Sequence, residues 1–248
     1  MKVFRYILKE ENPTIIPISD THIGDKNFNK KELIKYLEKA DYILLNGDIM
    51  NTATKNSVSF EYGSDPSDDL NKAVEIFKPY AHKILSVTEG NHEHRIAKEV
   101  GLSLTQLFCH QLGIIDKYAG ISAYLFLNVG SKKINYKIYH SHGFGGGRSV
   151  GAKSNKLYDM SKICDADVYI ISHTHQQQNF PADYIRPNLR KYKLEQITQY
   201  FINSGAFMSY GGYGETYMYP PSTIGTPIMR LFGNRHDVET TIGGMKGE

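Results

Sequence analysis

Residues 84–95 read ILSVTEGNHEHR, a short apolar run followed directly by several closely spaced polar side chains. The run at residues 84–88 has the length and β-branched content of a buried strand. Comparable runs recur along the chain, at residues 14–19, 42–46, 122–129, 134–140 and 167–172. Stretches with helical spacing, at residues 30–39 and 68–78, separate the early runs, and Ser67 is a suitable N-cap for the second. This alternation predicts an α/β sheet with mainly parallel strands.

The remainder of the chain predicts fewer regular elements. We expect a helix at residues 102–112, a hairpin at 122–140 and a helix near 156–163. After Gln178 the sequence predicts short strands and loops rich in Gly, Tyr and Pro, and then an irregular tail from about residue 235. A length of 248 residues suits one α/β domain, so we expect residues 1–248 to form a single domain.

The composition is that of an ordinary globular protein, with 40% hydrophobic and 22% charged residues. The net charge of +3 does not by itself indicate a nucleic-acid partner, although residues 186–193 are locally basic; such a stretch is also typical of a solvated strand face. Two cysteines give no disulfide framework, which favours a reducing compartment. With no run of transmembrane length and no signal-peptide core, we expect a cytoplasmic protein without a membrane partner. The oligomeric state is left open.

Polar side chains with metal-binding atoms follow five of the expected strands. They are Asp20 and His22, then Asp48, then Asn91 and His92, then His140 and His142, and finally His173 and His175. In open α/β sheets, ligands bind beyond the carboxyl ends of the strands, so these endings are expected to converge. Mixed oxygen and imidazole donors favour Mn²⁺, Fe, Zn²⁺ or Ni²⁺ over Ca²⁺. The donors exceed what one tetrahedral ion needs, which indicates two ions. A single histidine of this kind, considered without the others, is more often an ordinary surface or core residue than a metal ligand.

In their order D-x-H, G-D, G-N-H-E, H and H-x-H, the blocks at residues 20–175 resemble the calcineurin-like metallophosphoesterase superfamily, in particular its phage and bacterial members. The resemblance implies a four-layer α/β/β/α sandwich of two mixed sheets. It also implies two metal sites that share Asp48, with Mn as the first choice of metal. One site comprises Asp20, His22, Asp48 and His175. The other comprises Asp48, Asn91, His140 and His173.

The resemblance further implies that a hydroxide between the metals attacks phosphorus in line, with His92 beside the phosphate as charge stabiliser or general acid. Two residues depart from the family pattern: Ser172 replaces a Gly, and Asn51 replaces an acidic residue that orients the general acid. An amide stabilises imidazolium less well than a carboxylate, so Glu93 is an alternative acid.

Several neighbouring residues have roles that the pattern leaves open. Either histidine of H-S-H-G can be the ligand; His140 is preferred because it lies nearer the strand, leaving His142 for the second shell or the substrate. Arg95 and Arg148 are candidate phosphate contacts, although both are also ordinary surface charges. We expect His94 to be exposed. Residues 146–154 resemble a phosphate-binding P-loop with one residue too many before Lys153, so we interpret them as a loop at the rim of the site.

The first functional hypothesis is a binuclear metal-dependent phosphoesterase, in particular a phosphodiesterase or nuclease. The basic stretch at 186–193 and the Tyr-rich residues 210–220, whose rings can stack on bases or pack in a hairpin, favour a nucleic acid. The alternatives are a phosphomonoesterase or protein phosphatase, and a binding scaffold that has lost catalysis. We also expect residues 51–66 to form a loop over the active site.

Overall fold

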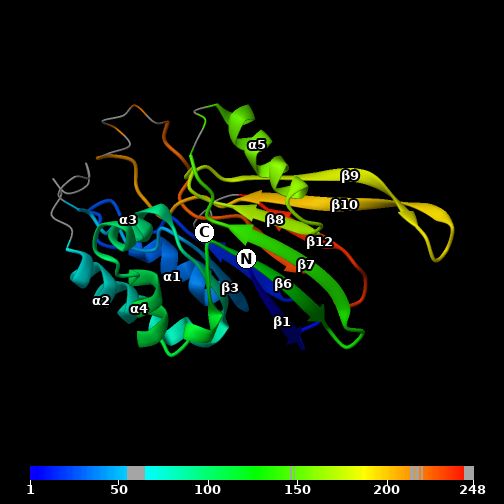
Figure 1. Cartoon of the computed structure of the whole chain (residues 1–248), viewed down its shortest axis with the longest axis horizontal. Coiled ribbons are helices and arrows are strands. Elements are labelled where there is room, and N and C mark those ends of the chain that lie inside the picture. Colours follow the sequence, from blue (N-terminus) through cyan, green and yellow to red (C-terminus); the bar gives the residue numbers. More distant parts are fainter. Residues whose placement is uncertain are drawn as a thin grey trace.

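The computed structural model describes residues 1–54, 65–145, 147, 149–212, 215, 218 and 220–242, which include two six-stranded sheets. Figure 1 shows these sheets with helices α1 to α4 gathered at one side and α5 at another. The first sheet has the order β1-β6-β7-β8-β10-β9. Its strands are β1 (Lys2–Leu8), β6 (Ser122–Val129), β7 (Ile134–Ser141), β8 (Val168–Ile171), β9 (Gln178–Asn188) and β10 (Lys193–Asn203).

The second sheet has the order β12-β11-β2-β3-β4-β5. Its strands are β2 (Thr14–Ile18), β3 (Tyr42–Asn46), β4 (Ile84–Thr88), β5 (Tyr118–Gly120), β11 (Ile228–Leu231) and β12 (Val238–Thr241). The strands β2 to β5 pair in parallel, whereas β11 pairs antiparallel to β2. The parallel strands all end at the same edge of the sheet, as the alternation of strands and helices predicts.

Three hydrophobic clusters define four layers. The largest joins the second sheet to the helices α1 (Lys30–Lys39), α2 (Pro66–Phe77), α3 (Asn91–Val100) and α4 (Leu104–Gln111). A second cluster, with Leu44, Ile138 and Ile170 fully buried, lies between the two sheets. The third packs α5 (Val150–Asp159) on the outer face of the first sheet through Leu157 and Tyr169. The expected α/β/β/α sandwich of two mixed sheets is therefore confirmed.

Helices α1, α2 and α4 agree with the sequence predictions except at their ends, whereas α3 was not predicted and α5 begins earlier than the helix expected near residues 156–163. Helix α1 has the predicted bounds, and α4 is shorter by three residues. The N-cap of α2 is Asp65 and not Ser67, because the Asp65 carboxylate accepts the N–H groups of Ser67 (2.7 Å) and Asp68 (3.3 Å) while Pro66 occupies the first turn. Helix α5 begins at Val150, so most of the P-loop-like segment is helical.

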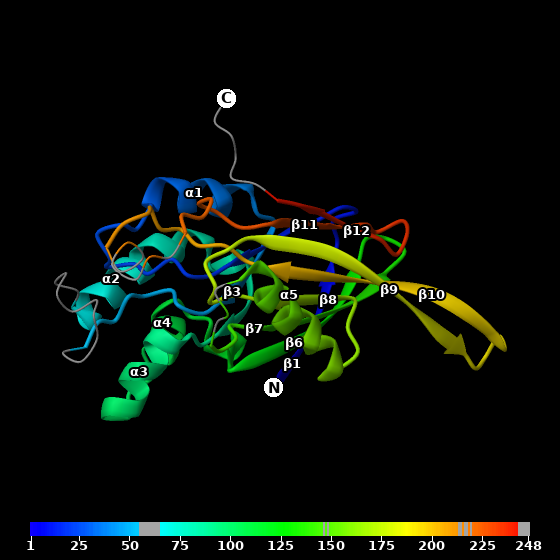
Figure 2. The same cartoon turned by 90° about the horizontal axis from the view of Figure 1, so that it is seen from above.

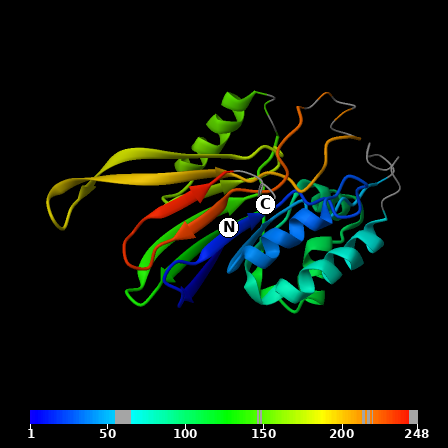
Figure 3. The same ribbon diagram turned by 180° about the vertical axis from the view of Figure 1, so that it is seen from behind.

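The structure adds strands where the sequence predicted none or only short ones. Strand β1 was missed; it pairs in parallel with β6 at the edge of the first sheet. The strands β9 and β10 are not short, because they pair over eleven residues each. Their hairpin extends beyond the other strands (Figures 1 and 2). The expected irregular tail contains β12, which pairs with β11. From behind, Figure 3 shows the hairpin on the opposite side of the molecule from α1 and α2.

Candidate metal centre

The candidate ligands follow directly on the parallel strands, and five of them have left-handed backbone conformations. They are Asp20 (φ 48°), His22 (φ 45°), Asp48 (φ 49°), His173 (φ 72°) and His175 (φ 54°). A positive φ is unfavourable for residues other than glycine and persists only where the surrounding structure enforces it. Such residues tend to gather at functional sites. The endings of β2, β3 and β8 therefore hold their candidate ligands at a cost in backbone strain.

Two glycines let the loops after β3 and β4 approach each other. A Cβ atom on Gly90 would lie 2.0 Å from the main-chain nitrogen of Asp48, and one on Gly47 would lie 2.6 Å from the Cα atom of Gly90. Gly47 also has a φ of 80°, which favours glycine. The glycines of G-D and G-N-H-E are thus required because two backbones meet at this point.

The described residues contain three overlapping groups whose ligand atoms all lie within 4.8 Å of one another. The groups are Asp20, His22 and His175; His22, Asp48 and His92; and Asp48, His142 and His173. The first and third groups have no member in common, and each offers one carboxylate and two imidazoles. Asn91 adjoins the third group, since its Oδ1 lies 3.1 Å from the Nε2 atom of His142. Two neighbouring cation sites are the simplest interpretation of this arrangement.

His140 does not join these groups, and His142 takes the place predicted for it. The ring of His140 is fully buried between the sheets, with Nδ1 2.8 Å from Asn46 Oδ1 and Nε2 2.6 Å from Ser86 Oγ. Burial lowers the pKa of His140 to about 3. Strand β7 continues to Ser141, so His140 still belongs to the core, and His142 is the first residue beyond the strand. The structure therefore brings His142, and not the preferred His140, to the other candidate ligands.

His142 is oriented as a metal ligand would be. Its Nδ1 atom lies 2.7 Å from the main-chain oxygen of Asn46, which can only accept, so Nδ1 carries a proton. Its Nε2 atom lies 3.2 Å from Asp48 Oδ2. Burial opposes a charge here, but the Asp48 carboxylate raises the pKa of His142 to about 10. An imidazolium thus balances the carboxylates, and a bound cation would replace its proton.

Residues around Asp20 also suit a bound cation. The Oδ1 atom of Asp20 is buried without a hydrogen-bond partner in the described part of the chain, although His175 Nε2 lies 3.2 Å away. The Nε2 atoms of His22 and His175 lie 3.1 Å apart. A buried carboxylate oxygen and two converging imidazole nitrogens are the donor set that a transition metal accepts. The other oxygen of Asp20 accepts hydrogen bonds from Ser19 Oγ (2.6 Å) and the His173 N–H (3.2 Å).

Glu93 is a structural support and not an exposed acid. Its buried carboxylate accepts the main-chain N–H groups of Asp48 (3.1 Å), Met50 (2.9 Å) and Gly90 (3.1 Å). Burial, together with the nearby charge of Asp48, raises the pKa of Glu93 to about 7. The side chain fixes the backbone around Asp48 and does not face a substrate.

His92 lies beside the ligands, and main-chain atoms position it. The main-chain N–H of His92 donates to Asp48 Oδ1 (2.8 Å), and the ring Nδ1 lies 2.7 Å from the carbonyl oxygen of Asn51. Its ring packs edge-on against that of His22, with centroids 4.4 Å apart. Burial lowers the pKa of His92, and the positive charge of Arg95 adds to this effect. The backbone carbonyl of Asn51 therefore orients the His92 ring, the role that the sequence suggested for the side chain at this position.

A buried hydroxyl network beneath the site explains the serine at position 172. Its Oγ lies 2.7 Å from Ser204 Oγ and accepts from Asn46 Nδ2 at 2.5 Å. Ser204 Oγ lies 2.6 Å from Ser19 Oγ, which in turn donates to Asp20. The serines thus link two strand endings from different sheets. Sequence reasoning missed Ser19 and Ser204, because an isolated serine at a strand end carries no signal of its own.

Lys153, the lysine of the P-loop-like segment, supports a ligand loop. Its Nζ donates to Gln176 Oε1 (3.0 Å) and to the carbonyl oxygen of Thr174 (3.4 Å), between His173 and His175. Lys153 therefore borders a ligand loop, but residues 150–154 of the segment are helical and do not form the loop that was expected. Arg148 lies outside the described residues, as do residues 55–64 of the expected covering loop and parts of 210–220.

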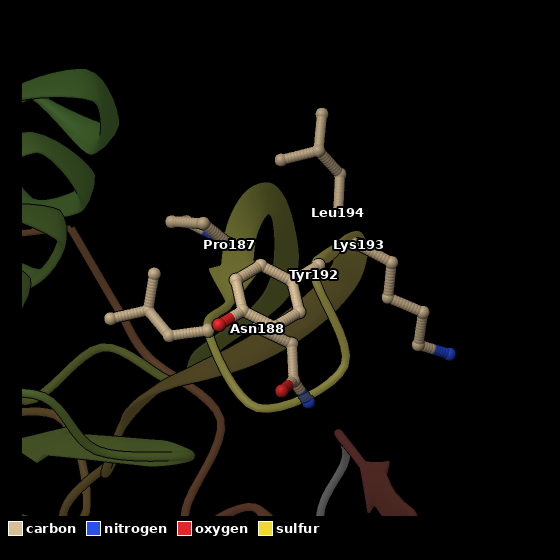
Figure 4. A pocket seen from close by; sticks show the side chains of 6 residues that line it. Pro187, Asn188, Tyr192, Lys193 and Leu194 are labelled. Carbon is tan, nitrogen blue, oxygen red and sulfur yellow. The ribbon is translucent and has the colours of Figure 1, made fainter.

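His94 and a pocket in the basic stretch at residues 186–193 lie away from the ligands. His94 is half exposed, and its Nδ1 lies 3.2 Å from Glu89 Oε2. A pocket of about 280 Å³ lies at the far end of the β9–β10 hairpin, lined by Pro187, Asn188, Leu189, Tyr192, Lys193 and Leu194 (Figure 4). The hairpin leaves the site at Gln178, so a tip ten residues on lies roughly 30 Å away at about 3.4 Å per residue. This pocket therefore has no part in the metal centre.

None of the helices in the described part of the chain is long and apolar enough to cross a membrane.

Comparison with known proteins yields a match to the family model described as calcineurin-like phosphoesterase, over residues 13–177. No curated protein sequence matches. Among solved structures, a metallophosphoesterase from Sphaerobacter thermophilus is 14% identical with a TM-score of 0.48, covering 92% of this chain and 87% of that one. Vacuolar protein sorting 29 from Cryptosporidium parvum is 15% identical with a TM-score of 0.47, covering 94% of this chain and 98% of that one. The phosphoesterase YfcE from E. coli is 14% identical with a TM-score of 0.44, covering 92% and 98%.

Proposed function

This chain belongs to the calcineurin-like phosphoesterase family, and on that premise we propose that it is a phosphoester hydrolase dependent on two divalent metal ions. The observation that carries the proposal is the pair of carboxylate and imidazole groups, Asp20 with His22 and His175, and Asp48 with His142 and His173. We assign these residues, together with Asn91, as the ligands, with Asp48 shared between the ions. Manganese is our first choice of metal, with Fe, Zn or Ni as alternatives.

Divalent ions bound there supply Lewis acidity toward the phosphoryl oxygens and activation of the attacking water. The protein positions the ester between the ligand loops and His92. Because the Asn51 carbonyl can only accept, it holds the proton of the neutral imidazole on Nδ1 and leaves a lone pair on Nε2. To act as a general acid, His92 must therefore first be protonated, and burial opposes this. The geometry favours substrates whose leaving group departs as a stable anion without a proton.

A phosphodiester is our first substrate class. A neutral His92 suits the single charge of a diester better than the double charge of a monoester. The basic stretch at residues 186–193 gives no support for nucleic acid, since it lies on the outlying hairpin and Arg186 pairs there with Asp165. Phosphomonoester hydrolysis is the second candidate.

The test is hydrolysis of bis(p-nitrophenyl) phosphate against p-nitrophenyl phosphate, with Mn²⁺, by the wild type and His92→Ala. A higher rate on the diester that falls in the variant supports phosphodiester hydrolysis. A higher rate on the monoester replaces it with the second candidate. Metal binding without hydrolysis of either ester points to a scaffold that has lost catalysis.

A further inference from the structure

Three hydrogen-bond donors beside His92 are buried without partners in the described part of the chain. They are Asn51 Nδ2, Thr52 Oγ1 and Arg95 Nη1. Asn51 is only 2% exposed and Thr52 is fully buried. Buried polar groups are paired in the great majority of proteins, and leaving one unpaired is costly. A group of such donors at one place indicates a ligand that brings acceptor atoms.

The residues that carry these donors are neighbours along helix α3. Residues 51–54 run alongside helix α3, because the Asn51 carbonyl contacts His92 at one end and Thr54 Oγ1 donates to Glu99 Oε1 (3.2 Å) at the other. Arg95 follows His92 by three helical positions and precedes Glu99 by four, so it lies between these contacts on the same face. It stands one turn, about 5 Å, further along the helix than His92.

We infer that Arg95, Asn51 and Thr52 form a subsite for an anionic leaving group, and that the bond hydrolysed is a phosphoanhydride. The inference rests on the proposed function and narrows its substrate class, because the attacked phosphorus of a nucleoside diphosphate carries two bridging oxygens, as the phosphorus of a phosphodiester does. A guanidinium with amide and hydroxyl donors matches the oxygens of a phosphate.

The reaction balances without a further reactant. The oxygen of water adds to phosphorus, and the bridging P–O bond breaks with its electron pair remaining on the leaving phosphate. The proton of water passes to solvent. A phosphate is a weakly basic leaving group, so its departure needs no general acid.

The test compares two substrates with the same thymidine 5′-phosphoryl group. Thymidine diphosphate has a phosphate leaving group, and the p-nitrophenyl ester of thymidine 5′-phosphate has an uncharged aromatic one of similar acidity. We measure kcat/KM with Mn²⁺ for the wild type, Arg95→Met and Lys98→Met. The last variant is the control, because Lys98 is an exposed cation on the same helix.

The expected result is that Arg95→Met lowers kcat/KM for thymidine diphosphate by about 10- to 100-fold, the size of a lost charge-assisted contact, and changes the ester by less than about threefold. Lys98→Met changes neither. An equal loss on both substrates would place Arg95 on the scissile phosphate and overturn the inference while leaving the proposed function intact.

If neither substrate is hydrolysed, a binding measurement shows whether the subsite inference fails together with the proposed function or stands without it. Inorganic phosphate is titrated calorimetrically into metal-depleted wild type and Arg95→Met. Binding that weakens about tenfold in the variant supports the subsite although the proposed function has failed. Equal affinity, or no binding by the wild type, overturns the subsite.

Discussion

The Nδ1 atom of His92 lies 2.7 Å from the main-chain carbonyl oxygen of Asn51. Members of the family that the sequence resembles use an acidic side chain from this position, whereas here the backbone holds the imidazole. Removing the Asn51 side chain should therefore leave His92 in place. For Asn51→Ala we expect a loss of less than about tenfold on the p-nitrophenyl ester of thymidine 5′-phosphate, against about 10²- to 10⁴-fold for His92→Ala. Equal losses in the two variants would show that the side chain orients His92.

The exchange of His140 for His142 as a ligand predicts different metal contents. His142→Ala should reduce the bound metal from two ions to one per chain, because it removes a nitrogen 3.2 Å from Asp48. His140→Phe should retain two ions, since both ring nitrogens of His140 are already bonded to Asn46 and Ser86. Elemental analysis of the purified, Mn-loaded variants measures this. Loss of an ion only in His140→Phe would restore the ligand expected from the sequence.

The burial of His140 also predicts a pH dependence of stability. Its folded-state pKa is lowered to about 3, so the unfolded chain binds the extra proton first as the pH falls below the usual histidine value. The stabilisation is complete above about pH 6.5 and is lost toward pH 3, with about 2 kcal/mol lost by pH 5.

Urea unfolding of the metal-depleted protein at pH 7 and pH 5 checks this dependence. The wild type should lose more stability between these values than His140→Phe. His110→Gln, which removes an exposed histidine, should behave like the wild type. Identical pH dependence in the wild type and His140→Phe would argue against a buried neutral imidazole.

The contact between the loops after β3 and β4 predicts that Gly90 tolerates no side chain. A Cβ atom there would lie 2.2 Å from Asp48 Oδ1, so Gly90→Ala should cost about 1–3 kcal/mol or more and weaken metal binding. Gly151→Ala is the matched control, because its Cβ would meet open space in α5, and a gain of about 0.4–1 kcal/mol is expected. Thermal unfolding with and without Mn²⁺ measures the stability and the metal binding of the two variants. Similar behaviour of the two variants would refute the close approach.

Most of the architecture was predictable because the spacing of apolar residues follows the buried faces of the helices and strands. Helix α1 and the strands β3 and β4 have the bounds that their apolar residues indicate. Strand β1 was missed because Val3, Arg5 and Ile7 all remain exposed at the sheet edge, so its pattern resembles no buried strand. The length of the β9–β10 hairpin was missed for the same reason.

The candidate site was predictable as a set of strand endings and less so in its details. A one-residue error in the end of β7 led to the choice of a core histidine as candidate ligand, because the sequence does not show whether the strand stops at His140 or Ser141. The backbone bond from Asn51 to His92 has no sequence signal, since every residue has a carbonyl group. Arg95 was a candidate phosphate contact from its chemistry alone, and its unpaired neighbours appear only in three dimensions.

The most direct test of the central claim is metal content and turnover of the wild type beside Asp48→Asn, after removal of metal with a chelator and reloading with Mn²⁺. The substitution keeps the size of the side chain but removes the charge shared by two of the ligand groups. The account predicts two ions and restored hydrolysis of the thymidine p-nitrophenyl ester in the wild type, with at least one ion lost and turnover reduced by about 10³-fold or more in the variant. Hydrolysis by Asp48→Asn at the wild-type rate, or by the metal-free wild type, would contradict it.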